Sequence, residues 1–207
     1  MGAAPAPTAS PIAAAIRVLA SGSAGNCTVL LMRVMGQRRI CLIDAGLSPR
    51  RTRRLIEEAG LSMDQLDSVL LTHLDHDHWH SGWVAGLPKH AKLRLHRKHA
   101  AIARREGALP ERSEAFDEPF DLFPGVRVTS AVGSHDAQGV ATFRFEFACP
   151  QGSASAASLG FATDVGRITD DLIVTRLGPE RFMVVANAGN AAKDEARLKA
   201  LAVGLNA

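Results

Sequence analysis

The densest group of possible metal ligands in this chain is a run of eight residues, His-Leu-Asp-His-Asp-His-Trp-His, at positions 73–80. Six of the eight can ligate a metal, and they include half of the chain's eight histidines. Imidazole and carboxylate ligands together suit zinc, manganese or iron. Because the hydrophobic segment 69–72 leads into this run, the sequence predicts a metal site where a buried strand opens into a loop.

The geometry of an extended chain divides the ligands of this run between two sides, because side chains alternate along a strand. His73, Asp75 and Asp77 would share one side, and the even-numbered histidines would point the other way. A bend at Asp77 would bring members of both sets around one or two ions. The alternative is a solvated histidine-rich loop that binds metal only incidentally. The interleaved acids and the preceding strand favour a dedicated site.

The same run carries a family resemblance. Residues 72–78, Thr-His-Leu-Asp-His-Asp-His, resemble the Thr-His-x-His-x-Asp-His signature of the metallo-β-lactamase-fold hydrolases. Further segments at 19–27, 42–46, 134–137 and 161–166 follow in the order that this family requires. The Ser-Gly-Ser-x-Gly-Asn turn within the first of them is similar to a bacterial subgroup that includes DNA-exonuclease-like members.

The resemblance implies a set of imidazole and carboxylate ligands: His73, Asp75, Asp77, His78, His135 and Asp164. The first ion would be held by His73, Asp75 and His135. The second would be held by Asp77 and His78, with the remaining aspartate as a bridge. We expect one or two divalent ions, with zinc favoured and manganese or iron as alternatives.

Hydroxide is the nucleophile that such a site would supply, because a bound metal lowers the pKa of water toward about 7. Asp77 is the expected catalytic residue, since it would orient this hydroxide while also touching the metal. Asp44 is expected to accept a hydrogen bond from a ligand histidine, which fixes the orientation of the ring.

The chain departs from the family's pattern at two places. Asp75 stands where the second motif histidine would be, so an oxygen ligand replaces a nitrogen. No histidine follows His135, and residues 184–190, which correspond to the family's last histidine, offer only amide side chains. The second metal is therefore expected to bind more weakly than the first, with water or His80 filling its open position, or the second position is left empty.

Composition and length are those of a soluble globular protein: 207 residues, 46% hydrophobic and 22% charged. The formal charge of +3 is mildly basic and does not by itself imply nucleic acid. Three cysteines without a Cys-x-x-Cys pair argue against a disulfide framework and for a reducing cytoplasm. No segment approaches the roughly 18 apolar residues of a membrane span.

The order of predicted elements favours an α/β (α+β) fold with two sheets packed face to face and helices outside. The resemblance implies a four-layer αββα sandwich, short at its C-terminus. Residues 1–15, rich in Ala and Pro, are expected to form a disordered tail before a single domain over 16–207. Strands are expected at 16–19, 28–34, 39–43, 69–72, 93–96, 125–131, 141–147, 158–163 and 182–186. Helices are expected at 49–59, 99–107, 169–177 and 194–203, with one short helical turn at 62–67.

The predicted function is that of a metal-dependent hydrolase, with a phosphodiesterase or nuclease-like enzyme favoured. The substrate would be a small molecule or a nucleic acid. A lactone or thioester hydrolase is the alternative enzyme, and a degenerate member that binds metal or a partner without turnover is the third possibility. Two basic regions could contact phosphates, although a solvated helix face is the favoured interpretation of the first. They comprise Arg50, Arg51, Arg53 and Arg54, and then Arg94, Arg97, Lys98, Arg104 and Arg105.

Overall fold

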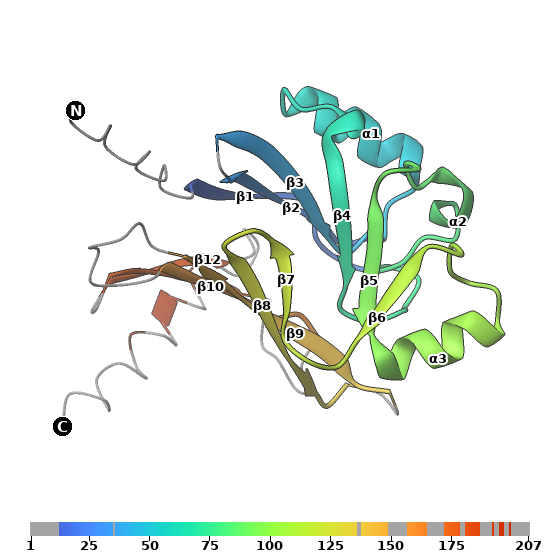
Figure 1. Ribbon diagram of the computed structural model, residues 1–207. Coiled ribbons are helices and arrows are strands. Elements are labelled where there is room, and N and C mark those ends of the chain that lie inside the picture. The colour runs from blue at the N-terminus through green and yellow to red at the C-terminus, as the bar shows by residue number, and fades with distance from the viewer. Residues whose placement is uncertain are drawn as a thin grey trace, which may run out of the picture.

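Two six-stranded sheets form the centre of the protein (Figure 1). The computed structural model describes residues 13–34, 36–135, 138–148, 157–164, 172–178 and 181–186, with residues 192, 195, 196 and 199. The first sheet has the order β1 (Ala13–Ala20), β2 (Cys27–Val34), β3 (Gln37–Ile43), β4 (Leu66–Leu71), β5 (Lys92–His96) and β6 (Ser113–Phe116). Strands β1 to β3 are antiparallel, and β3 to β6 are parallel.

The second sheet is antiparallel throughout. Its strands lie in the order β12 (Arg181–Ala186), β11 (Leu172–Gly178), β10 (Ala157–Phe161), β9 (Val140–Phe147), β8 (Val126–Gly133) and β7 (Phe120–Phe123). A core that includes Leu30, Ile43, Phe143 and Phe145 fills the space between the two sheets. The expectation of two sheets packed face to face is confirmed.

Helices cover the outer face of the first sheet (Figure 1). They are α1 (Pro49–Glu58), α2 (Trp83–Gly86) and α3 (Arg97–Arg105), and one 3-10 turn (Met63–Gln65) precedes β4. A second core lies under them, with Val29, Leu42, Ile56 and Trp83 among its members. Within the described part of the chain, the helices and the two sheets thus account for three of the four expected layers.

Helix α1 shows how local sequence sets these elements. Ser48 caps it by accepting a hydrogen bond from the backbone N–H of Arg51, and Pro49 occupies the first helical position. Thr52 and Ile56 are buried one turn apart, so the remaining face is left to solvent. Gly60 follows with a φ of 72°, a conformation that ends a helix at little cost for glycine.

The largest error of the sequence prediction is the helix expected at 169–177. The described part of this segment is strand β11, which pairs with β10 on one side and β12 on the other. Its residues 173–175 are Ile-Val-Thr, three β-branched residues in a row that favour a strand over a helix. The sequence prediction also missed the short elements β6, β7 and α2.

Boundaries at the two ends differ from expectation as well. Strand β1 begins at Ala13, inside the segment expected to be a tail, because residues 13–15 pair with residues 31–33 of β2. Residues 1–12 lie outside the described part of the chain. Most of the helix expected at 194–203 also lies outside it, although its described residues Glu195, Ala196 and Lys199 are helical.

Two of the three cysteines lie in the cores as free thiols. Burial raises the pKa of the Cys27 thiol to about 12, with a further contribution from the charge of Asp44. Burial likewise raises the pKa of the Cys41 thiol to about 12. Both side chains therefore behave as small apolar core residues. Among the described residues, no helix has the length and apolar character needed to cross a membrane.

Candidate metal centre

The His/Asp run lies at the edge of the first sheet where its parallel strands end. Strand β3 ends at Ile43 and is followed by Asp44, and β4 ends at Leu71 and is followed by Thr72 and His73. The second sheet brings His135, which follows β8, and Asp164, which follows β10, to the same place. The site therefore forms where the two sheets meet at one edge.

Backbone contacts dock the ligand loop onto the segment that follows β3. Ala45 donates its N–H to the carbonyl of His78 at 2.8 Å, and His80 donates its own to the carbonyl of Ala45 at 2.9 Å. The N–H of Asn26 donates to the carbonyl of Asp77 at 2.6 Å. A Cβ at Gly46 would collide with that same carbonyl, so only glycine permits this close approach. The Asp-Ala-Gly segment after β3 therefore holds the ligand loop in place through backbone contacts.

Asp44 and Thr72 fix the rings of His73 and His78. The Nδ1 of His78 lies 2.8 Å from Asp44 Oδ2, and Nδ1 of His73 lies 2.9 Å from the Thr72 hydroxyl. That hydroxyl donates to the Asp44 carboxylate at 2.9 Å, so it accepts from His73. Both Nδ1 atoms therefore carry a proton, and both Nε2 atoms are directed at the site. The prediction that Asp44 accepts a hydrogen bond from one of these histidines is confirmed.

Two aspartates of the site adopt a backbone conformation that is rare for residues other than glycine. Asp44 has a φ of 60° and Asp164 a φ of 49°. Aspartate is among the residues that tolerate this left-handed region best, and such residues concentrate at functional sites. The two strained backbone positions are therefore those whose carboxylates contact His78.

The ligand atoms form two overlapping groups of possible metal ligands. In the first, Asp75 Oδ2 lies 3.5 Å from His73 Nε2 and 3.2 Å from His135 Nε2. In the second, Asp164 Oδ2 lies 3.7 Å from His73 Nε2 and 2.8 Å from His78 Nε2. The first group is the one that the sequence predicts, whereas the second contains His73 in place of Asp77. Asp164 belongs to the second group and approaches His73, the residue that both groups share, and its bridging role stays a prediction.

His73 Nε2 gives the most direct indication that this set fits a metal. The atom is buried and has no hydrogen-bond partner within the described part of the chain. Burial lowers the pKa of His73, which keeps the ring neutral as a metal ligand must be. Ligands about 2.1 Å from a tetrahedral ion stand roughly 3.4 Å apart, close to the spacings around this atom. A divalent ion would satisfy it.

Asp77 lies beside the second group without belonging to it. Its Oδ2 is 3.7 Å from His78 Nε2 and accepts a hydrogen bond of 3.2 Å from the Asn26 amide. Burial alone would lower the pKa of His78, but the hydrogen bond and charge of Asp44, together with Asp164 and Asp77, raise it to about 9. An ion in the second group would therefore have to displace a proton from His78.

The other histidines of the run take no part in the described ligand groups. His76 is exposed to solvent. His80 turns away, and its Nδ1 accepts the backbone N–H of Gly82 at 3.0 Å. The expectation that His80 completes the second position is therefore not supported by its placement.

Two residues of the site were not identified from the sequence. Asn26 accepts from the N–H of Gly22 through Oδ1 at 2.9 Å, which leaves its Nδ2 directed at Asp77 and at His78. Thr72 links Asp44 to His73. Asn26 is the last residue of the Gly/Ser turn, and Thr72 is the first residue of the ligand motif. Their residue types alone do not indicate these contacts.

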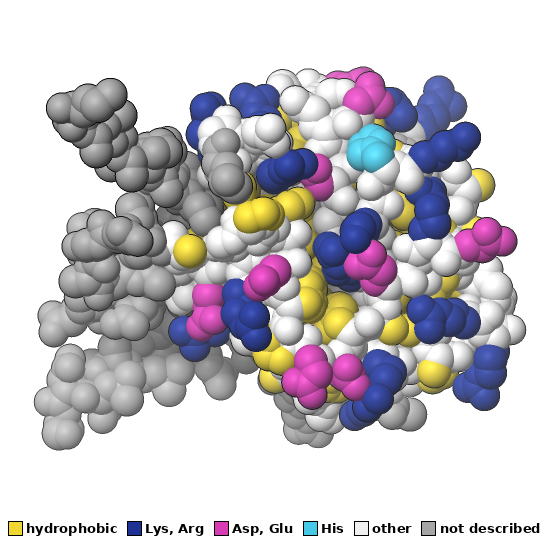
Figure 2. All heavy atoms as spheres, viewed as in Figure 1, with side chains coloured by type: hydrophobic (Ala, Val, Ile, Leu, Met, Phe, Trp, Pro, Cys, Tyr) yellow, Lys and Arg dark blue, Asp and Glu magenta, His cyan; other side chains and the backbone are white. Residues whose placement is uncertain are grey.

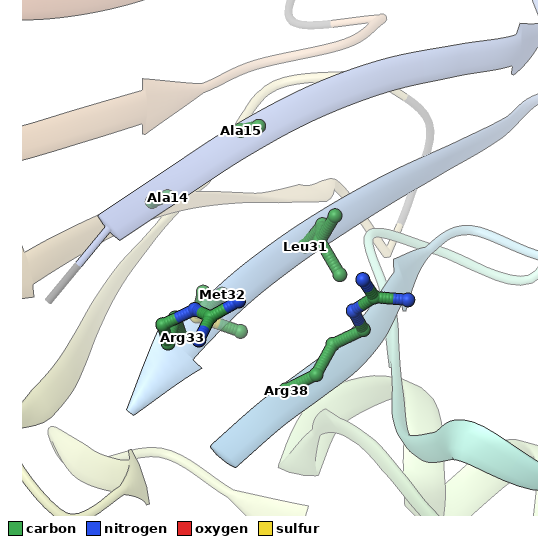
Figure 3. A pocket seen from close by; sticks show the side chains of 6 residues that line it. All are labelled: Ala14, Ala15, Leu31, Met32, Arg33 and Arg38. Carbon is green, nitrogen blue, oxygen red and sulfur yellow. The ribbon is translucent and has the colours of Figure 1, made fainter. Parts of the chain in front are cut away.

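A pocket on the first sheet lies apart from this centre (Figure 3). It is lined by Ala14, Ala15, Leu31, Met32, Arg33 and Arg38. Arg33 and Arg38 are cross-strand partners near the far end of the β2–β3 hairpin, away from Cys27 and Ile43 at the site edge. With no imidazole or carboxylate in its lining, this pocket is not the metal centre.

Comparisons with known proteins agree with this geometry. Residues 22–149 match the family model described as the metallo-beta-lactamase superfamily. Two curated relatives are an exodeoxyribonuclease, WalJ, of Streptococcus pneumoniae, 25% identical over 175 residues, and the exodeoxyribonuclease YycJ of Bacillus anthracis, 27% identical over 176 residues. Each alignment covers 82% of this chain and 61% of the relative, so the chain spans less than two thirds of these proteins.

Solved structures show the same fold. A metallo-beta-lactamase of Cronobacter sakazakii, a mutant of its HARLDQ motif, superposes with a TM-score of 0.52 at 20% sequence identity. The match covers 71% of this chain and 60% of that one, and at this identity it bears on the fold alone. The family model spans more than half of the sequence, including the ligand run and His135. The chain therefore belongs to the metallo-beta-lactamase superfamily.

Proposed function

We propose that this protein is a metal-dependent phosphodiesterase of the nuclease type. The observation that carries the proposal is the pair of overlapping His/Asp groups around the unpartnered Nε2 of His73. The exodeoxyribonuclease relatives support nucleic acid as the substrate class, at 25–27% identity. The buried free thiols of Cys27 and Cys41 agree with a cytoplasmic location.

The ligands suit zinc, and the high share of carboxylate oxygens also suits manganese or iron. When bound, a divalent ion would supply Lewis acidity and lower the pKa of water toward about 7. His73, Asp75 and His135 would hold the first ion, and His73, His78 and Asp164 stand ready for a second. Because one Nε2 binds one ion, His73 would belong to the first, which leaves the second position with fewer protein ligands and weaker affinity.

Asp77 would act on the attacking water. Its Oδ2 is within reach of the ligand groups yet outside them, and the Asn26 amide fixes its orientation by a hydrogen bond. A carboxylate held in this way can accept the proton of a water molecule and align the oxygen for attack on phosphorus. Asn26 is itself held by Gly22, so the turn before β2 positions the proposed general base.

Helix α1 offers the better of the two basic surfaces for a phosphate backbone. Its four arginines are exposed, and among the described residues only Arg54 has an ion-pair partner, Glu58 at 3.5 Å. Arg94 and Arg97 of the second region are paired with Glu114 and Asp117, both at 2.9 Å. Figure 2 shows Lys and Arg side chains distributed over the half of the molecule that carries the helices.

Replacing the four α1 arginines by alanine is expected to weaken binding of DNA without preference for its sequence. Each lost phosphate contact should lower the slope of log K against log salt by about 0.7 to 0.9. The measurement is binding of a fluorescent oligonucleotide to metal-free protein across a salt series. As a control in which two charges are removed, Arg104 and Arg105 of α3 are replaced by alanine. An unchanged salt slope in the α1 variant would remove this helix from the substrate path.

The reaction itself is tested with a substrate panel on metal-loaded protein: single- and double-stranded DNA, a generic phosphodiester, a lactone and a thioester. Metal-dependent cleavage of DNA and of the phosphodiester is the expected result. Cleavage confined to the lactone or thioester would replace the proposal with the other hydrolase class. Tight metal binding with no turnover of any substrate would indicate a member that binds without catalysis.

A further inference from the structure

A buried histidine outside the metal centre contacts the hairpin that carries one of its ligands. His99 lies on α3 and is fully buried. Its Nε2 is 2.8 Å from the backbone carbonyl of Gly139, which stands between β8 and β9. The contact joins the helix layer of the first sheet to the end of a hairpin of the second sheet.

The chemistry of this contact fixes which nitrogen of the His99 ring donates. A carbonyl oxygen only accepts hydrogen bonds, so Nε2 carries the proton and donates it to Gly139. Nδ1, at the other side of the ring, is buried and finds no hydrogen-bond partner among the residues that the structure describes. An apolar side chain would avoid this cost to stability. The hydrogen bond that Nε2 donates to Gly139 is therefore the contribution that an apolar side chain at this position would lack.

The end of the β8–β9 hairpin is held on a second side as well. Ala141 donates its N–H to the carbonyl of Thr72 at 2.8 Å, directly before the ligand His73. Gly139 has a φ of 73°, and a Cβ on it would come within 2.5 Å of the carbonyl of Gly133, its neighbour across the hairpin. The backbone at this point is thus fixed between β4 and α3.

His135 lies in this hairpin, between Gly133 and Gly139, and its Nε2 is 3.2 Å from Asp75 Oδ2. The side chain of His135 is 27% exposed, whereas those of His73 and His78 are buried. Side-chain packing therefore restrains the position of His135 less than it restrains the other two histidines. We infer that His99 is a positioning residue that holds His135 in the first ligand group through the carbonyl of Gly139. The inference rests on the proposed function only in taking His135 as a ligand.

Two substitutions separate the hydrogen bond from simple filling of the core. His99→Met has a similar size and no donor, and His99→Gln places an amide N–H near the position of Nε2. Ile56→Val, on α1, is the matched control, because it removes a buried methyl group far from the hairpin in sequence and on another helix. All three are compared with the wild-type chain for thermal stability, zinc affinity by chelator competition, and amide exchange of Ala141 without metal.

The expected result is a loss of about tenfold in zinc affinity for His99→Met, in line with changes to the supports of metal ligands. Exchange at Ala141 should accelerate in the same variant, and His99→Gln should restore both. Ile56→Val should lower stability and leave zinc affinity unchanged. Gly139→Ala, whose Cβ would meet the Gly133 carbonyl, perturbs the end of the hairpin directly and should weaken zinc binding even where His99→Met does not fold.

Wild-type zinc affinity in both His99→Met and Gly139→Ala would overturn the inference. So would equal losses in the Met and Gln variants, since these would assign the effect to packing. A wild-type chain that binds no zinc would defeat the proposed function. In that case the amide exchange rate of Ala141 still tests the inference. An unchanged rate in His99→Met overturns it, and if that variant does not fold, an unchanged rate in Gly139→Ala does so.

Discussion

Asp77→Ala is expected to lower phosphodiester hydrolysis by about a thousandfold, a typical effect of losing a general base. The fold should survive, because Asp77 is partly exposed and its described side-chain hydrogen bond is the one from Asn26. Loss of one such bond costs about 1 kcal/mol. Metal content should also change little, since Asp77 belongs to neither group of ligand atoms.

The measurement is the turnover number at saturating metal, with metal content determined on the same samples. Asp77→Asn keeps the size and shape of the side chain but removes the negative charge that makes its oxygen a base. This variant should therefore be nearly as inactive as the alanine variant. Asp64→Asn, an acid of the 3-10 turn, is the control and should retain wild-type activity. Activity near wild type in Asp77→Ala would exclude a role for this carboxylate in activating water.

His73→Leu is expected to abolish the stabilisation that metal confers while leaving the metal-free protein about as stable as the wild type. The substitution removes the unpartnered Nε2 and one hydrogen bond to Thr72, two changes of opposite sign that are each about 1 kcal/mol. At a metal concentration of a hundred times Kd, the wild-type chain should gain about 2.7 kcal/mol in unfolding free energy. The variant should gain none of it.

Unfolding by denaturant, with and without zinc, measures both quantities on each protein. His76→Leu is the matched control, because this exposed histidine of the same run contributes to neither group and should keep the full effect of zinc. A large destabilisation of metal-free His73→Leu would show that the imidazole is needed for folding itself. A retained zinc effect would place the ion elsewhere.

Sequence reasoning could name most side chains of the candidate centre because they are concentrated in one run. His73, Asp75 and His78 follow a buried strand, and the end of β4 places them at one edge of the sheet. His135 and Asp164 were predicted only through the order of motifs that the family resemblance supplied. Their approach to His73 depends on the packing of two sheets, which no local pattern encodes.

Other features were beyond local reasoning for the same reason. The hydrogen bond of His99 to Gly139 joins residues 40 positions apart. Nothing near His99 in the sequence distinguishes it from an ordinary helical residue. The ligand grouping differs from the prediction because the loop bends so that Asp77 meets Asn26, a residue 51 positions earlier.

The strand β11 was predicted as a helix, although its sequence contained the contrary signal. Thr169 is of a residue type that often caps helices, whereas residues 173–175 are β-branched and favour a strand. Such residues pack well between two neighbouring strands, and β11 pairs with both β10 and β12. Tertiary pairing therefore decided the conformation of this segment.

The central claim is that the cluster around His73 binds the catalytic metal. A crystal structure of the zinc-loaded protein, with anomalous data collected at the zinc absorption edge, tests it most directly. We predict a strong anomalous peak about 2.0 to 2.2 Å from His73 Nε2, within similar distances of His135 and Asp75, and a second, weaker peak beside His78 and Asp164. Peaks confined to exposed histidines such as His76 or His90, with none near His73, would contradict the account.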